Sequence, residues 1–144
     1  MNWKILMTNG EVREFNAMFG NFHDSCLKEM SYATGGYVST DLEMNVESLP
    51  IARYLFQRQM KEPSVVELEF REILQMNIVP VGNDEGVDII HTHLYFEDGI
   101  FFLSEKDYEF EERKSDSTWI AAKYARWRVR DDLLGEDMVY MKDF

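Results

Sequence analysis

The sequence contains few residues that crosslink a chain or interrupt its secondary structure. Among 144 residues it has one cysteine, Cys26, and three prolines. A single cysteine cannot close an intramolecular disulfide, and no cysteine pair is present to form a structural zinc site. Residues 1–7 also lack the apolar stretch and cleavage site of a signal peptide. These absences predict a cytoplasmic protein.

Long hydrophobic runs are missing as well. The longest apolar stretches, such as residues 100–103, are far shorter than the roughly 20 residues that cross a bilayer, so we expect no membrane span. No linker-like segment and no repeat of fixed period divides the chain. At this length we therefore expect one globular domain over residues 1–144.

Positive charge is scarce. The chain has 27 Asp and Glu residues against 15 Lys and Arg residues, which gives a formal net charge of −12. Nucleic acid binding depends on basic side chains that displace counterions from phosphates, so DNA and RNA are poor candidate partners. A basic protein is a better one. A hydrophobic content of 45% and an aromatic content of 14% also argue against disorder.

Hydrophobic periodicity predicts one helix near the start of the chain. Val12, Phe15 and Phe19 follow a helical spacing with polar residues between them. Gly20 stands where a helix C-cap glycine is expected. We therefore expect a short amphipathic helix that ends at about this glycine.

After Gly20 the hydrophobic period changes to two, which predicts strands. The alternation is strict over residues 41–47 and predicts a half-buried strand, with Leu42, Met44 and Val46 on its apolar face. The patterns at 65–70 and 73–79 predict two further one-sided strands, the first with Glu67 and Glu69 on its polar face. Additional strands are predicted at 26–34, 54–59 and 118–130.

Asp98-Gly99 lies between two apolar runs and predicts a type I′ turn, because both turn positions need positive φ. We expect a hairpin over residues 88–105. Counting outward from the turn places four apolar side chains on the core face: Leu94, Phe96, Phe101 and Leu103. The predicted fold class is α+β, mainly β, with an antiparallel sheet of about seven strands and one short N-terminal helix.

The segment His23-Asp24-Ser25-Cys26 holds several residue types that act as nucleophiles or bases. Catalytic groups usually come together from separate elements, so adjacency in the sequence is weak evidence for a site. We interpret the segment as the turn between the helix and the first strand. Asp24 or Ser25 would bond local backbone amides, and Cys26 would be buried as a small apolar residue.

His91 and His93 would project from the same side of a strand, and His23 would complete a three-histidine zinc site. The predicted hairpin register places the ammonium group of Lys106 opposite His91, which disfavours a cation there. We therefore expect no metal and no cofactor. The alternative is a hydrolase or metal-dependent enzyme that uses His23, Cys26, His91 and His93.

Charge changes sign twice near the C-terminus. Residues 97–116 have a net charge of −5, residues 117–130 of +4 and residues 131–144 of −4. Arg126, Arg128 and Arg130 share one face of the predicted last strand. They would either hold a carboxylate or phosphate ligand or form ion pairs with the acidic segments beside them, and we favour the ion pairs.

The acidic segment at residues 105–112 places aromatic side chains between carboxylates. Such a surface suits a cationic partner, because aromatic residues anchor the contact while the carboxylates steer the encounter. The alternative is a solvated loop or an edge strand protected by its charge. The candidate binding residues are Tyr108, Glu109, Phe110, Glu111, Glu112, Arg126 and Arg128. No catalytic residue is predicted.

The stretch Phe19-Gly20-Asn21-Phe22-His23-Asp24, followed by strands that end in Trp119 and Trp127, resembles immunity-protein families of polymorphic toxin systems and small acidic bacterial proteins of unknown function. The resemblance implies a non-enzymatic protein that binds and blocks a cognate toxin. We therefore expect an acidic, non-enzymatic binding protein with a basic protein partner. A homodimer formed through an exposed edge strand is also compatible with the sequence.

Overall fold

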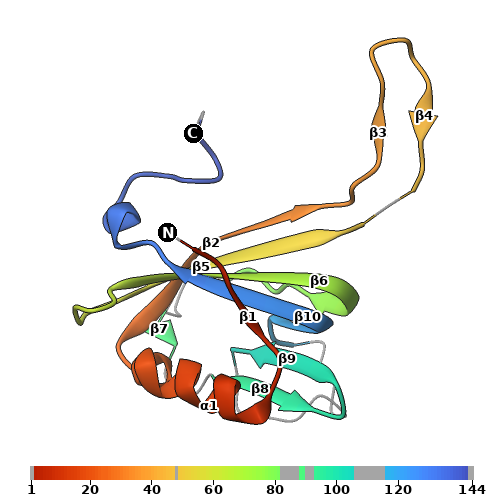
Figure 1. Ribbon diagram of the computed structural model, residues 1–144. Helices are drawn as coiled ribbons and strands as arrows, with labels where there is room; N and C mark the ends of the chain where they lie inside the picture. The colour runs from red at the N-terminus through yellow and green to blue at the C-terminus, as the bar shows by residue number, and fades with distance from the viewer. Residues whose placement is uncertain (1, 48, 82–87, 90–92, 106–115, 143–144) are drawn as a thin grey trace.

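The computed structural model describes residues 2–47, 49–81, 88–89, 93–105 and 116–142 (Figure 1). These residues form an antiparallel sheet with one α-helix, α1 at Asn9–Met18, packed beneath it. Short 3₁₀ turns follow the helix (η1, Gly20–Phe22) and the last strand (η3, Asp131–Leu133). The strands are β1 Lys4–Leu6, β2 Ser25–Ala33, β3 Tyr37–Val38, β4 Met44–Asn45, β5 Ile51–Arg58, β6 Val65–Asn77, β7 Asp88–Ile89, β8 Leu94–Glu97, β9 Ile100–Ser104 and β10 Trp119–Val129. The predicted fold class is confirmed.

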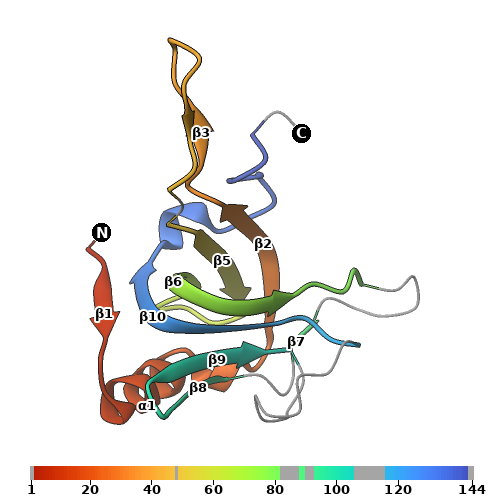
Figure 2. The same cartoon turned by 90° about the vertical axis from the view of Figure 1, so that its right-hand side faces the viewer.

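The main sheet has the strand order β7-β2-β5-β6-β10-β9-β8, and β1 pairs with β10 beside it. Strand β10 is long enough to pair with two strands along one edge. Residues 119–122 pair with β9, and residues 125–127 pair with β1. Figure 2 shows how the sheet curls so that β8 and β9 lie near the helix. One face of the sheet therefore encloses the apolar core, and the other face points outward.

The helix forms as the periodicity predicts and begins slightly earlier. The Thr8 hydroxyl accepts a hydrogen bond from the Glu11 amide at 3.1 Å, which caps the first turn. Gly20 follows the C-cap with a φ of +59°, a conformation that glycine adopts without strain. Asn16 is buried and pairs with the Leu94 backbone through both amide atoms, at 2.8 and 2.9 Å. These two bonds hold the helix against the β8–β9 hairpin.

The segment after the helix places aromatic side chains in the core. Phe22 contacts the rings of Phe19 and Phe56 edge to face, with ring centroids 5.2 and 5.0 Å apart. Asn21, Phe22 and Asp24 all have positive φ, so the chain turns sharply before β2. Residues 19–24 thus build a tight turn that packs Phe22 into the core.

The two strands predicted at 65–70 and 73–79 form one strand, β6, which contains a bulge. Glu72 has a φ of +49°, and the pairing with β10 shifts register between Ala121 and Ala122. The extra residue changes which side chains point inward. Ile73 and Met76 pack against the core, whereas Leu74 is 47% exposed. The face predicted for 73–79 is therefore correct at Met76 but wrong at Leu74 and at Ile78, which is 56% exposed.

The hairpin at the Asp98-Gly99 turn is confirmed over residues 94–104. Both turn residues have positive φ, and Phe96 pairs with Phe101 as the count predicts. Leu94, Phe101 and Leu103 are buried in the core, with Phe96 packed against it. The predicted hairpin extended back to residue 88. Residues 88–89 instead form β7, which pairs with β2 at the opposite edge of the sheet from β8. Residues 90–92 lie outside the described residues.

The half-buried strand predicted at 41–47 is wrong in length and in burial. Only Met44–Asn45 is a strand, and it pairs with β3 in a separate two-stranded sheet. The predicted apolar face is exposed: Leu42 at 83%, Met44 at 70% and Val46 at 78%. Residues 34–47, hereafter the arm, project from the ends of β2 and β5 away from the body (Figures 1 and 2).

Among the residues that the structure describes, no helix has both the length and the apolar character needed to cross a membrane.

The core holds one polar atom that makes no hydrogen bond among the described residues, the hydroxyl of Tyr54. Burial raises the pKa of this phenol, so it stays protonated. We expect Tyr54→Phe to leave the free energy of unfolding unchanged or to raise it by about 1 kcal/mol, because an unpaired buried hydroxyl is destabilising. Urea unfolding measures the effect. The matched variant is Tyr140→Phe, which removes a hydroxyl that donates to Glu67 and should lower stability by about 1–3 kcal/mol. A clear loss of stability in Tyr54→Phe would contradict the assignment.

Candidate functional site

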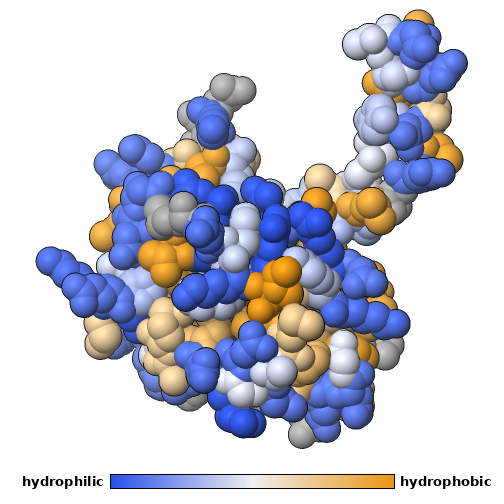
Figure 3. Space-filling model, in the orientation of Figure 1, coloured by the Kyte–Doolittle hydropathy of each residue, from blue (hydrophilic) through white to orange (hydrophobic). Residues whose placement is uncertain are grey.

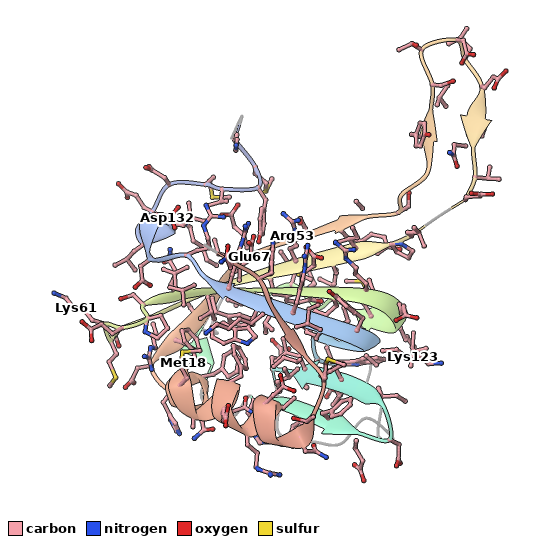
Figure 4. The ribbon with its side chains drawn as sticks, in the orientation of Figure 1. Met18, Arg53, Lys61, Glu67, Lys123 and Asp132 are labelled. Atoms are coloured by element: carbon pink, nitrogen blue, oxygen red, sulfur yellow. The ribbon has the colours of Figure 1, made fainter. Side chains whose placement is uncertain are left out.

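The outward face of the sheet carries a layer of charged side chains. The antiparallel register aligns Arg53 on β5, Glu69 on β6 and Arg126 on β10 in one row across three strands. Arg71 lies two residues further along β6, on the same face as Glu69. In the next row Glu67 is paired with Arg128. Figure 4 shows Arg53 and Glu67 on this face, above the ribbon of the sheet.

Glu69 binds three arginines at once, and its side chain is 0% exposed. One carboxylate oxygen accepts from Nε of Arg71 at 2.7 Å and Nε of Arg126 at 2.9 Å. The other accepts from Nε of Arg53 at 2.8 Å and Nη2 of Arg126 at 3.1 Å. Burial by itself raises the pKa of Glu69. The hydrogen bonds from Arg126 and Arg71, the charge of Arg126 and the bond from Arg53 together lower this pKa by more than burial raises it. The net pKa is therefore below its ordinary value.

Glu67 is also buried and has a different set of partners. It accepts from Nε of Arg128 at 2.7 Å and from the hydroxyl of Tyr140. Arg130 lies 3.9 Å away and binds Asp132 more closely, at 3.0 Å. Burial and the bond to Glu67 raise the pKa of Tyr140, so its hydroxyl remains a hydrogen-bond donor.

Two ends of the chain cover part of this layer. Near the N-terminus, the ring centroid of Trp3 lies 4.2 Å from the guanidinium carbons of both Arg126 and Arg128. The C-terminal segment at 131–142 crosses the far end of the same face, where Glu29 accepts from the amides of Val139 and Tyr140 at 2.8 and 3.0 Å. Between this segment and the arm, where Figure 4 labels Arg53, the surface carries hydrophilic side chains (Figure 3).

The predicted ion pairing of the arginines on β10 is present, but the acids come mainly from another element. Arg126 and Arg128 bind Glu69 and Glu67 of β6, and only Arg130 binds an acid of the C-terminal segment, Asp132. The interpretation of 65–70 as a one-sided strand is therefore wrong, because its polar face is buried beneath its own counterions. Acidic residues alternate with apolar ones at 66–70, and basic residues alternate with apolar ones at 125–129. This complementary pattern on two long strands is the sequence signal that would have revealed the pairing.

The arm is a second surface of unusual composition. Its five largest apolar side chains, Tyr37, Val38, Leu42, Met44 and Val46, are between 53% and 83% exposed. A tight turn closes it, with the Ser39 amide bonded to the Glu43 carbonyl at 2.9 Å and Leu42 at positive φ. Gly35 is needed at the root, because a Cβ there would lie 2.7 Å from the Leu49 amide nitrogen. Figure 3 shows apolar and hydrophilic side chains interspersed along the arm.

The histidines and the cysteine considered as catalytic or metal-binding residues occupy different elements. His23 is exposed after η1, half-buried Cys26 lies on β2, and the ring of His93 packs 3.9 Å from that of Tyr95. His91 and Lys106 lie outside the described residues. Within the described ranges, no group of three His, Cys, Asp or Glu side chains is placed to hold a metal ion.

The chain turns at residues 23–24 before β2, as predicted, but the hydrogen bonds of this turn differ from those expected. Ser25 is buried, and its hydroxyl donates to the Phe22 carbonyl rather than accepting from a local amide. The Asp24 carbonyl accepts from the Gln59 amide at 3.0 Å, which ties the turn to the end of β5. Cys26 is half-buried rather than fully buried. The candidate binding residues Tyr108, Glu109, Phe110, Glu111 and Glu112 lie outside the described residues.

Replacement of Glu69 tests the charged layer. We expect Glu69→Gln to lower the free energy of unfolding at pH 7 by about 3 kcal/mol, because three guanidinium groups lose their buried counterion. Because the folded-state pKa of Glu69 is lowered, its ionised form stabilises the fold above the unfolded-state pKa, and that contribution is lost as the pH falls through the folded-state pKa. The difference between the variant and the wild type should therefore shrink in acid. Denaturant unfolding at pH 7 and at pH 3 measures both values.

The matched control is Glu97→Gln, since Glu97 is an exposed acid on β8. This substitution should change stability by less than about 0.5 kcal/mol. An effect of Glu69→Gln as small as that of the control, or one that grows in acid, would show that Glu69 does not hold the layer together.

No protein-family model, curated protein or solved structure matches this chain. Two surfaces therefore remain as the basis for a functional conclusion: the projecting apolar arm and the arginine-rich area around Glu69.

Proposed function

We propose that the protein is a non-enzymatic, acidic, cytoplasmic binding protein whose arm engages a basic protein partner. The observation that carries this proposal is the exposure of five large apolar side chains, at 53–83%, on a hairpin that projects from the body. Exposed apolar groups gathered on one element are typical of interaction sites, whereas scattered ones are ordinary.

The construction of the arm suits strand addition by a partner. β3 and β4 have two residues each and, in the part of the chain that the structure describes, pair only with each other. A two-stranded hairpin of this kind is marginally stable in water. A partner strand that paired with an open edge would satisfy backbone groups and cover the apolar side chains, which favours association.

The charge of the arm selects the kind of partner. Residues 34–47 contain Asp41, Glu43 and Glu47 and no lysine or arginine. A hydrogen bond from the Ser39 hydroxyl is the main cause that lowers the pKa of Asp41, so this carboxylate is ionised at neutral pH. The net charge of −12 adds a long-range attraction for a basic protein. A basic segment with apolar side chains would complement the arm.

The resemblance of residues 19–24 to immunity proteins supports a more specific role within the same proposal. A protein of that kind blocks a toxin by covering the surface that the toxin needs, and a projecting acidic hairpin is a suitable means of occupying a basic groove. The aromatic and acidic side chains at 108–112 form a second candidate part of the contact surface. The arginine-rich area would repel the same basic partner, so we assign it no part in this contact.

The proposal is tested by crosslinking followed by titration. A photo-crosslinking residue at position 44 captures the partner in the native cell, and the purified partner is then titrated with the wild type by calorimetry. We expect a basic partner whose affinity falls at least about tenfold in Leu42→Ser/Met44→Ser/Val46→Ser, because three apolar contacts are lost. Asp41→Asn/Glu43→Gln/Glu47→Gln should reduce the association rate and its salt dependence.

The matched control changes equally exposed apolar residues elsewhere. Met7 and Met60 are 72% and 63% exposed, so Met7→Ser/Met60→Ser should bind like the wild type. Capture of an acidic partner, or equal affinity of the apolar arm variant and the control, would overturn the proposal. Crosslinking only to a second copy of the chain, with a dimer that the arm variant abolishes in sedimentation experiments, would replace the partner with self-association.

A further inference from the structure

The arginines around Glu69 outnumber the acids that they bind. Arg53, Arg71 and Arg126 share a single carboxylate, whereas Arg128 and Arg130 have Glu67 and Asp132 beside them. The group of three arginines with Glu69 therefore carries a surplus of positive charge on a chain whose net charge is −12. Ion pairing among the described residues balances the second group but leaves the first with a surplus of positive charge.

The hydrogen bonds within this group leave guanidinium donors available. Arg53 and Arg71 each bind Glu69 through Nε. Their terminal nitrogens make no hydrogen bond to any residue within the described ranges, although a guanidinium carries five N–H donors. The side chains of Arg53 and Arg71 are 36% and 42% exposed, against 19% for Arg126. Among the described residues, Arg53 and Arg71 therefore combine unbonded terminal nitrogens with the greater exposure to solvent.

The surroundings restrict the orientation of these guanidinium groups. Arg71 lies over the ring of Tyr124, with its guanidinium carbon 5.7 Å from the ring centroid, and Arg53 lies 5.5 Å from the centroid of Trp3. The shared carboxylate holds the Nε edges together from below. Arginines restrained in this way lose less conformational entropy when they bind an oxyanion through paired N–H groups.

We propose that Arg53, Arg71 and Arg126 form a binding site for a small oxyanion, a phosphate or a carboxylate, on the outward face of the sheet above Glu69. The anion accepts hydrogen bonds from the terminal nitrogens of Arg53 and Arg71 and balances the surplus charge. Trp3 forms one side of the site, because its ring also lies over Arg126. The site does not depend on the arm and goes beyond the proposed function.

The test is a titration of the full chain at low ionic strength with inorganic phosphate and, separately, with malonate. The readout is the indole N–H resonance of Trp3 in a nitrogen–proton correlation spectrum, since this ring touches the arginines. We expect a saturable shift with at least one probe. Saturation by phosphate alone, malonate alone or both supports the site and identifies the oxyanion that it accepts. No saturable shift with either probe overturns it.

Two variants locate the binding. Arg71→Gln and Arg53→Gln should each weaken anion binding by about tenfold, because each removes a charged group whose N–H donors bind the anion. Both should fold, because Arg126 keeps its two bonds to Glu69, and unchanged core resonances of Trp119 and Trp127 verify this. The control is Arg13→Gln, on the exposed side of α1, which should bind like the wild type. Equal affinity in all three variants would overturn the proposal.

The apolar arm variant separates this inference from the proposed function. Leu42→Ser/Met44→Ser/Val46→Ser should retain phosphate or malonate binding, and Arg71→Gln should retain binding to the arm's partner. Loss of anion binding in the arm variant would contradict the location of the site.

Discussion

The buried carboxylates of Glu67 and Glu69 are the constraint on which the sheet depends. Both project from β6, the strand between β5 and β10, onto the face opposite the apolar core. A charge in that position is costly unless it is paired and hydrogen-bonded, and the arginines that pair with it come from β5, β6 and β10. The ion pairs therefore favour one register: a slip by one residue would move either carboxylate into the core.

The same strands also supply the apolar core, which explains why the two faces are coupled. Leu68 and Phe70 alternate with Glu67 and Glu69 along β6, so one pairing register orders the core and the charged layer together. The chain ends complete the outward face, with Trp3 over the arginines and Tyr140 on Glu67. Because burial makes these electrostatic bonds stronger, the ends of the chain contribute to stability as well as to shape.

The two candidate binding surfaces have opposite chemical character. The arm is apolar and acidic and carries no core side chain that the sheet needs, whereas the arginine-rich area is basic and rests on a buried acid. Because the two surfaces are separate, the two proposed ligands, a basic protein and a small oxyanion, would not compete for one site. In the described part of the chain, no group of three His, Cys, Asp or Glu side chains is placed to hold a metal ion.

Local patterns determined the helix at α1 and the turn at Asp98-Gly99, because these depend on contacts between near neighbours in the chain. Alternation also predicted the long strand β10, although its partners β1 and β6 are distant in the sequence. Tertiary structure decided the rest. Leu42, Met44 and Val46 alternate as a buried strand does, yet no sheet face covers them, since the ends of β2 and β5 direct the arm away from the body. Glu67 and Glu69 alternate as solvent-facing residues do, yet they are buried. Alternation reports that a strand has two different faces; which face is covered depends on strands and chain ends that are distant in the sequence.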